Sequence, residues 1–230
     1  MRADRSNPPR RLRAFTLVEL MVAVGIIVLV LALAIPSVQA MLSGADYPAT
    51  LNTLSALLAT GQASAAAGDT VAGIRFGYDT VRDMQWAVFV TRAPSGVDMP
   101  DSLDRFIKIP GSDTFDMPRR NRVAPLSAVI GTGWDADDYG EIERLCSFYV
   151  LFDSQGVLAH GVPVWIWDDH DGDGNLQSGE ISTGTSERGL AVFDRQAWAS
   201  RSSNSDKRDY IRNGCDPLYI NRFTGTLIQP

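Results

Sequence analysis

Cysteine and histidine are scarce in this chain, with two of each among 230 residues. His160 and His170 form no pattern with a cysteine that would indicate a Cys/His catalytic pair. Cys146 and Cys215 are an even number of cysteines, and in an oxidising compartment they predict a disulfide. It would close a loop of about 70 residues and stabilise the fold by roughly 4 kcal/mol in the chain-entropy model. Two buried free thiols remain the alternative.

Basic residues are outnumbered by acidic ones. The chain has 21 lysine and arginine residues against 27 aspartate and glutamate residues, a formal net charge of −6. Binding to nucleic acid without sequence preference needs basic patches that neutralise phosphates. Outside the first 14 residues, the densest basic group is Arg119–Arg122, which is short and typical of a solvated loop. We therefore expect no nucleic-acid partner.

Long apolar runs are absent after residue 45, but one precedes it. The basic segment Arg10–Arg13 leads into a near-continuous apolar run, Phe15–Val38, whose one acid is Glu19. The run exceeds the ~18–20 residues that cross a bilayer as a helix. It is also longer than the roughly 7–15-residue core of a secretory signal peptide, and its best small-residue site, Ala32–Ala34, lies inside it. A carboxylate in a membrane segment costs roughly 2.5 kcal/mol or more without a partner, so Glu19 is a candidate functional residue.

The segment Arg13-Ala14-Phe15-Thr16-Leu17-Val18-Glu19-Leu20 resembles the class III processing site of type IV prepilins and of the pseudopilins of type II secretion. The resemblance implies that prepilin peptidase cuts between Ala14 and Phe15 and methylates the new N-terminus at Phe15. Glu19 matches the family's acid at the fifth mature position, and Pro36 matches its helix proline. Ala14 replaces the usual glycine, but alanine is a small variant, so cleavage is still expected. The implied partners are prepilin peptidase and other pilin or pseudopilin subunits.

The same resemblance sets the expected domains and location. Residues 1–14 form a cytoplasmic leader, 15–43 a transmembrane or spine helix, and 44–230 a periplasmic or extracellular globular domain. The leader's five arginines against one aspartate support this orientation, because positive flanks stay cytoplasmic. The precursor is expected to cross the inner membrane once and later to enter a periplasmic or surface filament. There Glu19 could meet the N-terminal amine of a neighbouring subunit and set the register, because an unpaired charge in such a core is costly.

The rest of the sequence predicts a pilin-like α+β domain, in which the N-terminal helix packs on an antiparallel sheet. Glycine and proline in 43–48 predict a break or bend in the helix, and the leucine spacing of 49–67 predicts a helix with one apolar face. Segments rich in β-branched and aromatic residues predict strands at 71–78, 84–90, 106–109, 145–152, 162–167 and in a closing hairpin over 218–228. Residues 79–83 suit a hairpin loop. We interpret 93–122 as mainly a long surface region and 131–143 as an acidic loop.

A second specific pattern is the segment 169–180, Asp-His-Asp-Gly-Asp-Gly-Asn-Leu-Gln-Ser-Gly-Glu. It matches the calcium loop D-x-[DN]-x-[DN]-G-x₅-E at every defined position. Ca²⁺ takes about six to eight oxygen ligands, and softer Cys or His ligands are absent from the ligand positions. The predicted ligands of a structural Ca²⁺ are Asp169, Asp171, Asp173, Asn175, Gln177 and Glu180. The alternative is a solvated Asp/Gly turn without a specific ion.

The patterns bear on three classes of function. The first is a structural subunit, of the minor type, of a type IV pilus or a secretion pseudopilus. Two segments resemble the minor group of these subunits. They are the turn at 152–156, Phe-Asp-Ser-Gln-Gly, and the hairpin segment 219–225. The second is a pilin-anchored adhesin or ligand-binding module stabilised by calcium, whose candidate contacts are Trp134, Tyr139, Trp165 and Trp167. The third, an enzyme, is not expected, because the carboxylates at 135–143 are better interpreted as a charged loop than as the paired acids of a glycosidase.

Overall fold

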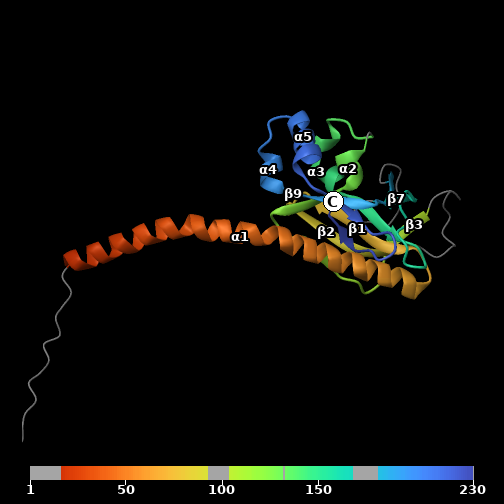
Figure 1. Cartoon of the computed structure of the whole chain (residues 1–230), viewed down its shortest axis with the longest axis horizontal. Helices are drawn as coiled ribbons and strands as arrows, with labels where there is room; N and C mark the ends of the chain where they lie inside the picture. The colour runs from red at the N-terminus through yellow and green to blue at the C-terminus, as the bar shows by residue number, and fades with distance from the viewer. Residues whose placement is uncertain (1–16, 93–103, 132, 168–180, 230) are drawn as a thin grey trace, which may run out of the picture. The chain divides into compact units, whose positions relative to one another are not determined.

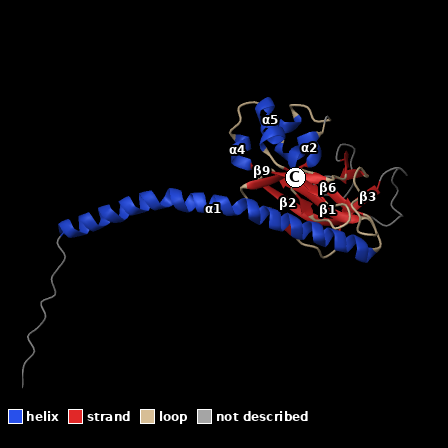
Figure 2. Ribbon diagram, viewed as in Figure 1, coloured by secondary structure: helices blue, strands red, loops and turns tan. Residues whose placement is uncertain are grey.

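The computed structural model describes residues 17–92, 104–131, 133–167 and 181–229. Contacts divide the chain into two compact units, Met1–Ala45 and Asp46–Pro230. The protein is α+β, with an N-terminal helix, two largely antiparallel sheets and several short helices (Figures 1 and 2). The predicted fold class is confirmed at this level.

Helix α1 spans Leu17–Gly68 and is α-helical throughout, so the predicted break at 43–48 is wrong. A proline within a helix costs about 3 kcal/mol, because it removes one backbone hydrogen bond and crowds the preceding turn. Contacts around Pro48 offset this cost. Tyr47 packs against the main core of the second unit. The Thr50 hydroxyl donates to the Asp46 carbonyl at 2.8 Å, which holds the turn around the proline in helical form.

The first sheet contains seven described strands in the order β6-β1-β2-β3-β7-β8, with β4 also paired to β2. All described pairs are antiparallel except β3 with β7, which is parallel. The predicted first hairpin is confirmed, because β1 and β2 pair along their length around the turn at 80–83. The strand bounds are β1 Ala72–Asp79, β2 Met84–Arg92, β3 Asp104–Lys108, β4 Thr114–Asp116, β6 Phe148–Phe152, β7 Pro163–Trp167 and β8 Ile181–Thr185.

The second sheet has four described strands in the order β11-β10-β9-β5. Short helices cover one of its faces (Figure 1). The strands are β5 Asn121–Pro125, β9 Gly189–Asp194, β10 Pro217–Ile220 and β11 Leu227–Ile228. The helices are α2 Leu126–Ile130, η1 Asp138–Gly140, α3 Ile142–Cys146, α4 Arg195–Ala199 and α5 Asn204–Gly214. Side chains cap two of them, because Asp194 accepts from the Ala197 amide at 2.8 Å and Ser203 from the Asp206 amide at 3.1 Å.

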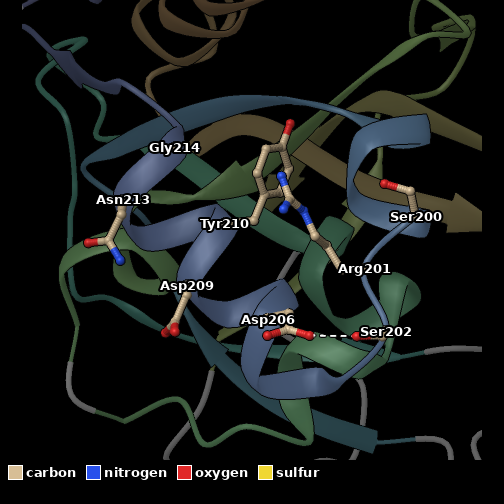
Figure 3. A pocket seen from close by; sticks show the side chains of 8 residues that line it. All are labelled: Ser200, Arg201, Ser202, Asp206, Asp209, Tyr210, Asn213 and Gly214. Atoms are coloured by element: carbon tan, nitrogen blue, oxygen red, sulfur yellow. Dashed lines mark hydrogen bonds between the residues drawn. The ribbon is translucent and has the colours of Figure 1, made fainter.

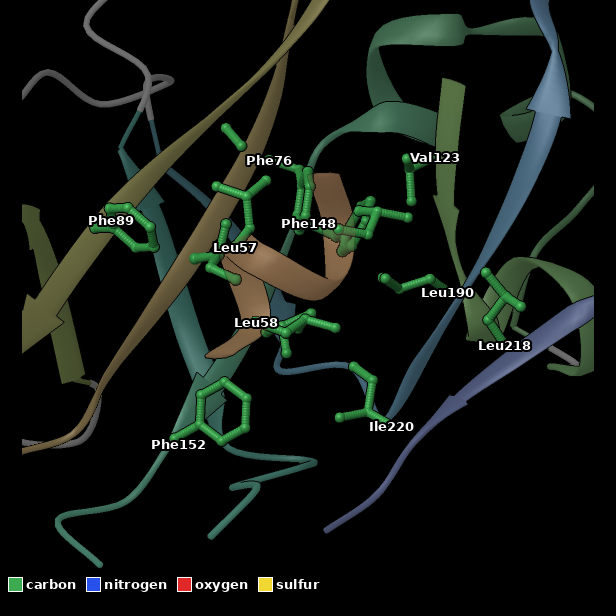
Figure 4. Packing of buried hydrophobic residues seen from close by; sticks show 14 of the residues in the cluster. Leu57, Leu58, Phe76, Phe89, Val123, Phe148, Phe152, Leu190, Leu218 and Ile220 are labelled. Carbon is green, nitrogen blue, oxygen red and sulfur yellow. The ribbon is translucent and has the colours of Figure 1, made fainter. Parts of the chain in front are cut away.

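The main core lies between α1 and the two sheets (Figure 4). Leu54, Leu57 and Leu58 of α1 are buried against alternate strand residues, among them Phe76 and Phe148, whose rings stack at 4.6 Å. The intervening residues of the first sheet face away from α1 because strand side chains alternate. Each fully buried large apolar side chain contributes about 1.5–3 kcal/mol, so this interface holds residues 46–68 of α1 on the domain.

A buried glutamine joins the two sheets. Gln85 of β2 is fully buried. Its side-chain amide donates to the carbonyls of Val123 and Cys146 at 2.8 and 2.9 Å, and its Oε1 accepts from the Val123 amide at 2.7 Å. The side chain thus pairs backbone groups of β5 and α3 as a neighbouring strand would.

The interpretation of Arg119–Arg122 as a solvated loop is wrong for its last two residues. They begin β5, which is buried along its length. Asn121 donates to the Thr50 hydroxyl of α1 at 3.1 Å. The Arg122 guanidinium, only 1% exposed as a residue, donates to the carbonyls of Arg119 and Asp83. The strand is buried because α1 and the β1–β2 turn cover it. Both are distant in sequence, so the local composition alone predicted a solvated loop.

Candidate functional site

The first part of α1 is apolar on every side. The large apolar residues from Leu17 to Leu31 each leave more than half of their surface exposed. Glu19, in the first described turn, is the one charged residue in that stretch, and it is exposed as well. A helix that is apolar all round is normally buried by lipid or by other protein. In the part of the chain that the structure describes, no helix is both long and apolar enough to span a membrane.

The second part of α1 carries a side chain that joins two turns. Gln62 donates from its amide to the carbonyl of Gly156 at 2.8 Å and to that of Phe223 at 2.9 Å. Gly156 and Gly225 both have positive φ, +74° and +64°, and a Cβ at either would press on Gln62, at 3.2 and 3.0 Å. The turn at 152–156 and the hairpin segment at 219–225, singled out separately in the sequence, thus meet on one residue of α1.

The predicted disulfide is not formed in the structure. Cys146 and Cys215 are both free and buried, and they belong to the same apolar cluster beneath the short helices. Burial raises the pKa of both thiols, that of Cys215 to about 12. A thiol held protonated in this way is a poor nucleophile. The alternative left open by the sequence, two buried free thiols, is the arrangement found.

Within the acidic segment, carboxylates bond to backbone amides of residues 135–138. Asp135 accepts from the amides of Asp137 and Asp138 at 3.0 and 3.1 Å. Asp138 is buried and forms an ion pair with Arg144 at 2.5 Å. It also accepts from the Asp135 amide at 2.9 Å. These bonds stabilise the turn that contains η1, so the interpretation of the segment as a loop holds only in part.

Two of the aromatic residues considered for ligand contact serve the core. Tyr139 is fully buried, donates to the Ala128 carbonyl and accepts from Arg212 at 2.9 Å. Trp134 packs against it, with ring centroids 5.7 Å apart. This pair therefore belongs to the core of the described domain rather than to a ligand-contacting surface. The side chains of Trp165 and Trp167 lie outside the described residues.

A half-buried carboxylate that the sequence did not single out caps α2. Glu187, just before β9, accepts from the Ser127 hydroxyl at 2.7 Å and from the Ser127 amide at 3.3 Å. Burial raises the pKa of the Glu187 carboxyl, and the bonds from Ser127 lower it in part. Glu187 follows a buried serine in a polar connection, so no sequence pattern marks it.

One comparison with known proteins gives a match. Residues 9–35 match the model of the prokaryotic N-terminal methylation motif. The chain carries a class III prepilin signal. No curated protein and no solved structure matches the chain.

The prepilin signal is that of type IV pilins and pseudopilins, which are substrates of prepilin peptidase and structural rather than catalytic proteins. Its cleavage residues, Ala14 and Phe15, lie outside the described residues. Glu19 lies inside both the matched segment and α1. The signal therefore covers the N-terminal end of the chain and leaves the globular unit to be interpreted from its own geometry.

The predicted calcium ligands also lie outside the described residues, so the calcium site stays a prediction. They are Asp169, Asp171, Asp173, Asn175, Gln177 and Glu180.

A groove of about 630 Å³ runs along α5 (Figure 3). Each of its charged side chains already has a partner nearby in the sequence. Ser202 donates to Asp206 at 2.8 Å, and Asp209 forms an ion pair with its neighbour Arg208. The Arg201 guanidinium stacks on the Tyr210 ring at 4.9 Å. The groove is thus a solvated surface built from one local segment.

A second hollow, of about 440 Å³, is built from three separate elements. It is called the Trp86 cleft here, and its lining includes Arg75 and Tyr78 of β1, Thr80, Trp86 of β2, Glu143 of α3 and Ser147. Sequence reasoning missed it, because Glu143 and Ser147, which complete its lining, lie far from the β1–β2 hairpin in the sequence.

Proposed function

We propose that the chain is a structural subunit, of the minor type, of a type IV pilus or a type II secretion pseudopilus. The observation that carries the proposal is the methylation motif at 9–35, which continues into an α-helix with exposed apolar side chains on all sides. Such a surface needs an apolar surrounding. Lipid supplies it before assembly, and the helices of neighbouring subunits supply it afterwards.

Processing comes first in this proposal. Prepilin peptidase cuts between Ala14 and Phe15 and methylates the new amine of Phe15. The basic leader stays in the cytoplasm, because positive flanks are retained there. The globular unit then faces the periplasm, with the inner membrane around the apolar segment.

Assembly follows through Glu19. In the filament its carboxylate pairs with the N-terminal amine of a neighbouring subunit. A charge buried without its partner costs several kcal/mol, so only the register that pairs the two is stable. The minor rank is supported by the two glycine turns that resemble the minor group and that both contact Gln62.

Mass spectrometry of the protein from cells with and without prepilin peptidase tests the proposal. The expected N-terminus is methylated Phe15 in the first strain and uncleaved leader in the second. An Ala14→Gly variant serves as a matched control that restores the usual residue before the cut and must give the same N-terminus. A chain that starts at Met1 in both strains, or one cut after Ala34 or Ala40, would contradict processing as a prepilin.

The loop at 169–180 is proposed to hold a structural Ca²⁺ that orders the connection between β7 and β8. Trp167 lies two residues before the first predicted ligand, so Tb³⁺ bound in the loop should show luminescence sensitised by tryptophan. Ca²⁺ should quench this signal by competition, and Glu180→Gln should weaken it because a bidentate carboxylate is lost. Equal signals from Glu180→Gln and from the native chain would exclude this loop as the site.

A second function, ligand binding by the displayed globular unit, is favoured by one observation, the Trp86 cleft.

A further inference from the structure

The Trp86 cleft opens on the face of the first sheet that is turned away from α1. Ile74 and Phe76 of β1, with Ala87 and Phe89 of β2, belong to the core that contains the α1 leucines. Arg75, Gly77 and Trp86 alternate with them and therefore lie on the opposite face. The cleft's volume of about 440 Å³ lies within the roughly 300–1,000 Å³ typical of small-molecule sites.

The aromatic wall of the cleft is fixed in place. Gly77 and Trp86 are direct cross-strand partners. A Cβ at Gly77 would come within 2.1 Å of Trp86 Cζ2, so the indole ring lies directly on the glycine backbone. The half-buried ring keeps part of its surface available to the cleft. A rigid aromatic surface loses little entropy when a ligand packs on it.

The guanidinium of Arg75 is positioned by two rings. Its Cζ lies 5.4 Å from the Trp86 ring centroid and 6.0 Å from that of Tyr149. These distances fall within the range of cation–π attraction. The Arg75 side chain is thus positioned by residues of strands β1, β2 and β6 rather than by a loop.

The rim supplies further polar groups. The side chains of Thr80 and Ser147 form no hydrogen bond to any described residue, and Glu143 forms no ion pair within the described part of the chain. Asp79, in contrast, already accepts from the amides of Val81 and Arg82 at 3.0 and 2.9 Å. The cleft therefore offers two hydroxyls and one carboxylate acceptor beside an aromatic wall on which Arg75 stacks.

This combination selects among ligand classes. A phosphate-bearing ligand would meet the acidic residues Asp79 and Glu143 against the single cation Arg75. An extended peptide would need a free strand edge, but β1 lies between β2 and β6 and β2 between β1 and its next partners. A sugar ring has C–H faces that pack on an indole and hydroxyls that both donate and accept. Its faces suit the Trp86 ring, and its hydroxyls suit the side chains of Thr80, Glu143 and Ser147.

We propose that the Trp86 cleft binds a saccharide, with one sugar ring packed on Trp86 and its hydroxyls hydrogen-bonded to Glu143, Ser147 and Thr80. The binding does not depend on assembly into a filament, and the N-terminal mass measurement tests the two proposals apart.

The test is saturation-transfer NMR on the full chain in detergent micelles, with the methyl glycosides of glucose, galactose, mannose and N-acetylglucosamine as probes. At least one glycoside at millimolar concentration should receive saturation from the protein. Glu143→Ala should weaken its binding about tenfold, because a charge-assisted hydrogen bond is lost. Trp86→Phe keeps an aromatic ring on Gly77 and should weaken binding several-fold.

Glu141→Ala is the matched control, because Glu141 is exposed, lies two residues from Glu143 and does not line the cleft. It should leave binding unchanged. Thermal unfolding of each variant separates loss of binding from loss of fold. Absence of saturation transfer to all four glycosides would overturn the proposal. So would binding that both cleft variants leave intact, because the sugar would then sit elsewhere.

Discussion

Replacing Gln85 with leucine should destabilise the globular unit by about 3 kcal/mol. Leucine keeps the volume of the side chain but leaves three buried backbone groups without a partner, namely the amide and carbonyl of Val123 and the carbonyl of Cys146. Each unsatisfied group costs about 1–3 kcal/mol. Burial of the apolar leucine side chain stabilises the fold by roughly 1.5–3 kcal/mol. This is less than the combined cost of the three unsatisfied backbone groups.

The effect is measured by thermal unfolding of the full chain in micelles, followed by near-ultraviolet circular dichroism. For a chain of this size a loss of 1 kcal/mol lowers Tm by about 2–4 °C, so a drop of about 6–12 °C is expected. Gln196→Leu, the same exchange at an exposed position of α4, should change stability by less than about 0.5 kcal/mol. If both variants have the Tm of the native chain, the Gln85 side chain does not stabilise the contact between the two sheets.

Three further predictions concern single groups. Glu187 has a raised pKa, so its ionised form is penalised in the fold and its favourable contribution is lost as pH rises through that pKa. The Tm of Glu187→Gln relative to the native chain should therefore be higher at about pH 8 than at about pH 4, and equal offsets would contradict the sign. Gly225→Ala should cost about 1–2 kcal/mol in chemical denaturation, because φ is +64° and the new Cβ meets Gln62; an unchanged midpoint would mean that the turn relaxes freely. Cys146 and Cys215 should react with a thiol reagent only after denaturation, and no reactive thiol even then would show that the two form a disulfide in the protein purified from cells.

Sequence patterns were most informative where a local run decides the outcome. The apolar segment with Glu19 near its start identified the prepilin signal. The alternation in β1 and β2 identified the first hairpin, because a strand with one face on α1 must repeat every two residues. In both cases the residues that determine the structure are neighbours in sequence.

Patterns failed where distant segments decide. Pro48 suggests a helix break, yet Tyr47 anchors that turn on a core supplied by later strands. Arg122 has the composition of a loop residue, yet α1 and the β1–β2 turn enclose the strand it occupies. Helices α4 and α5 are short and polar, and their only local signals are the caps Asp194 and Ser203.

The hydrogen bond between Gln62 and Phe223 also bears on the order in which contacts form during folding. It joins residues 161 positions apart, so it cannot form until Phe223 has been synthesised. Contacts of such long range are made late, because the entropy of closing the intervening loop must be overcome first. A chain that stops before Phe223 lacks this bond to α1 and the final hairpin with it. The packing of α1 against residues 219–225 is therefore completed only after the strands between them have folded.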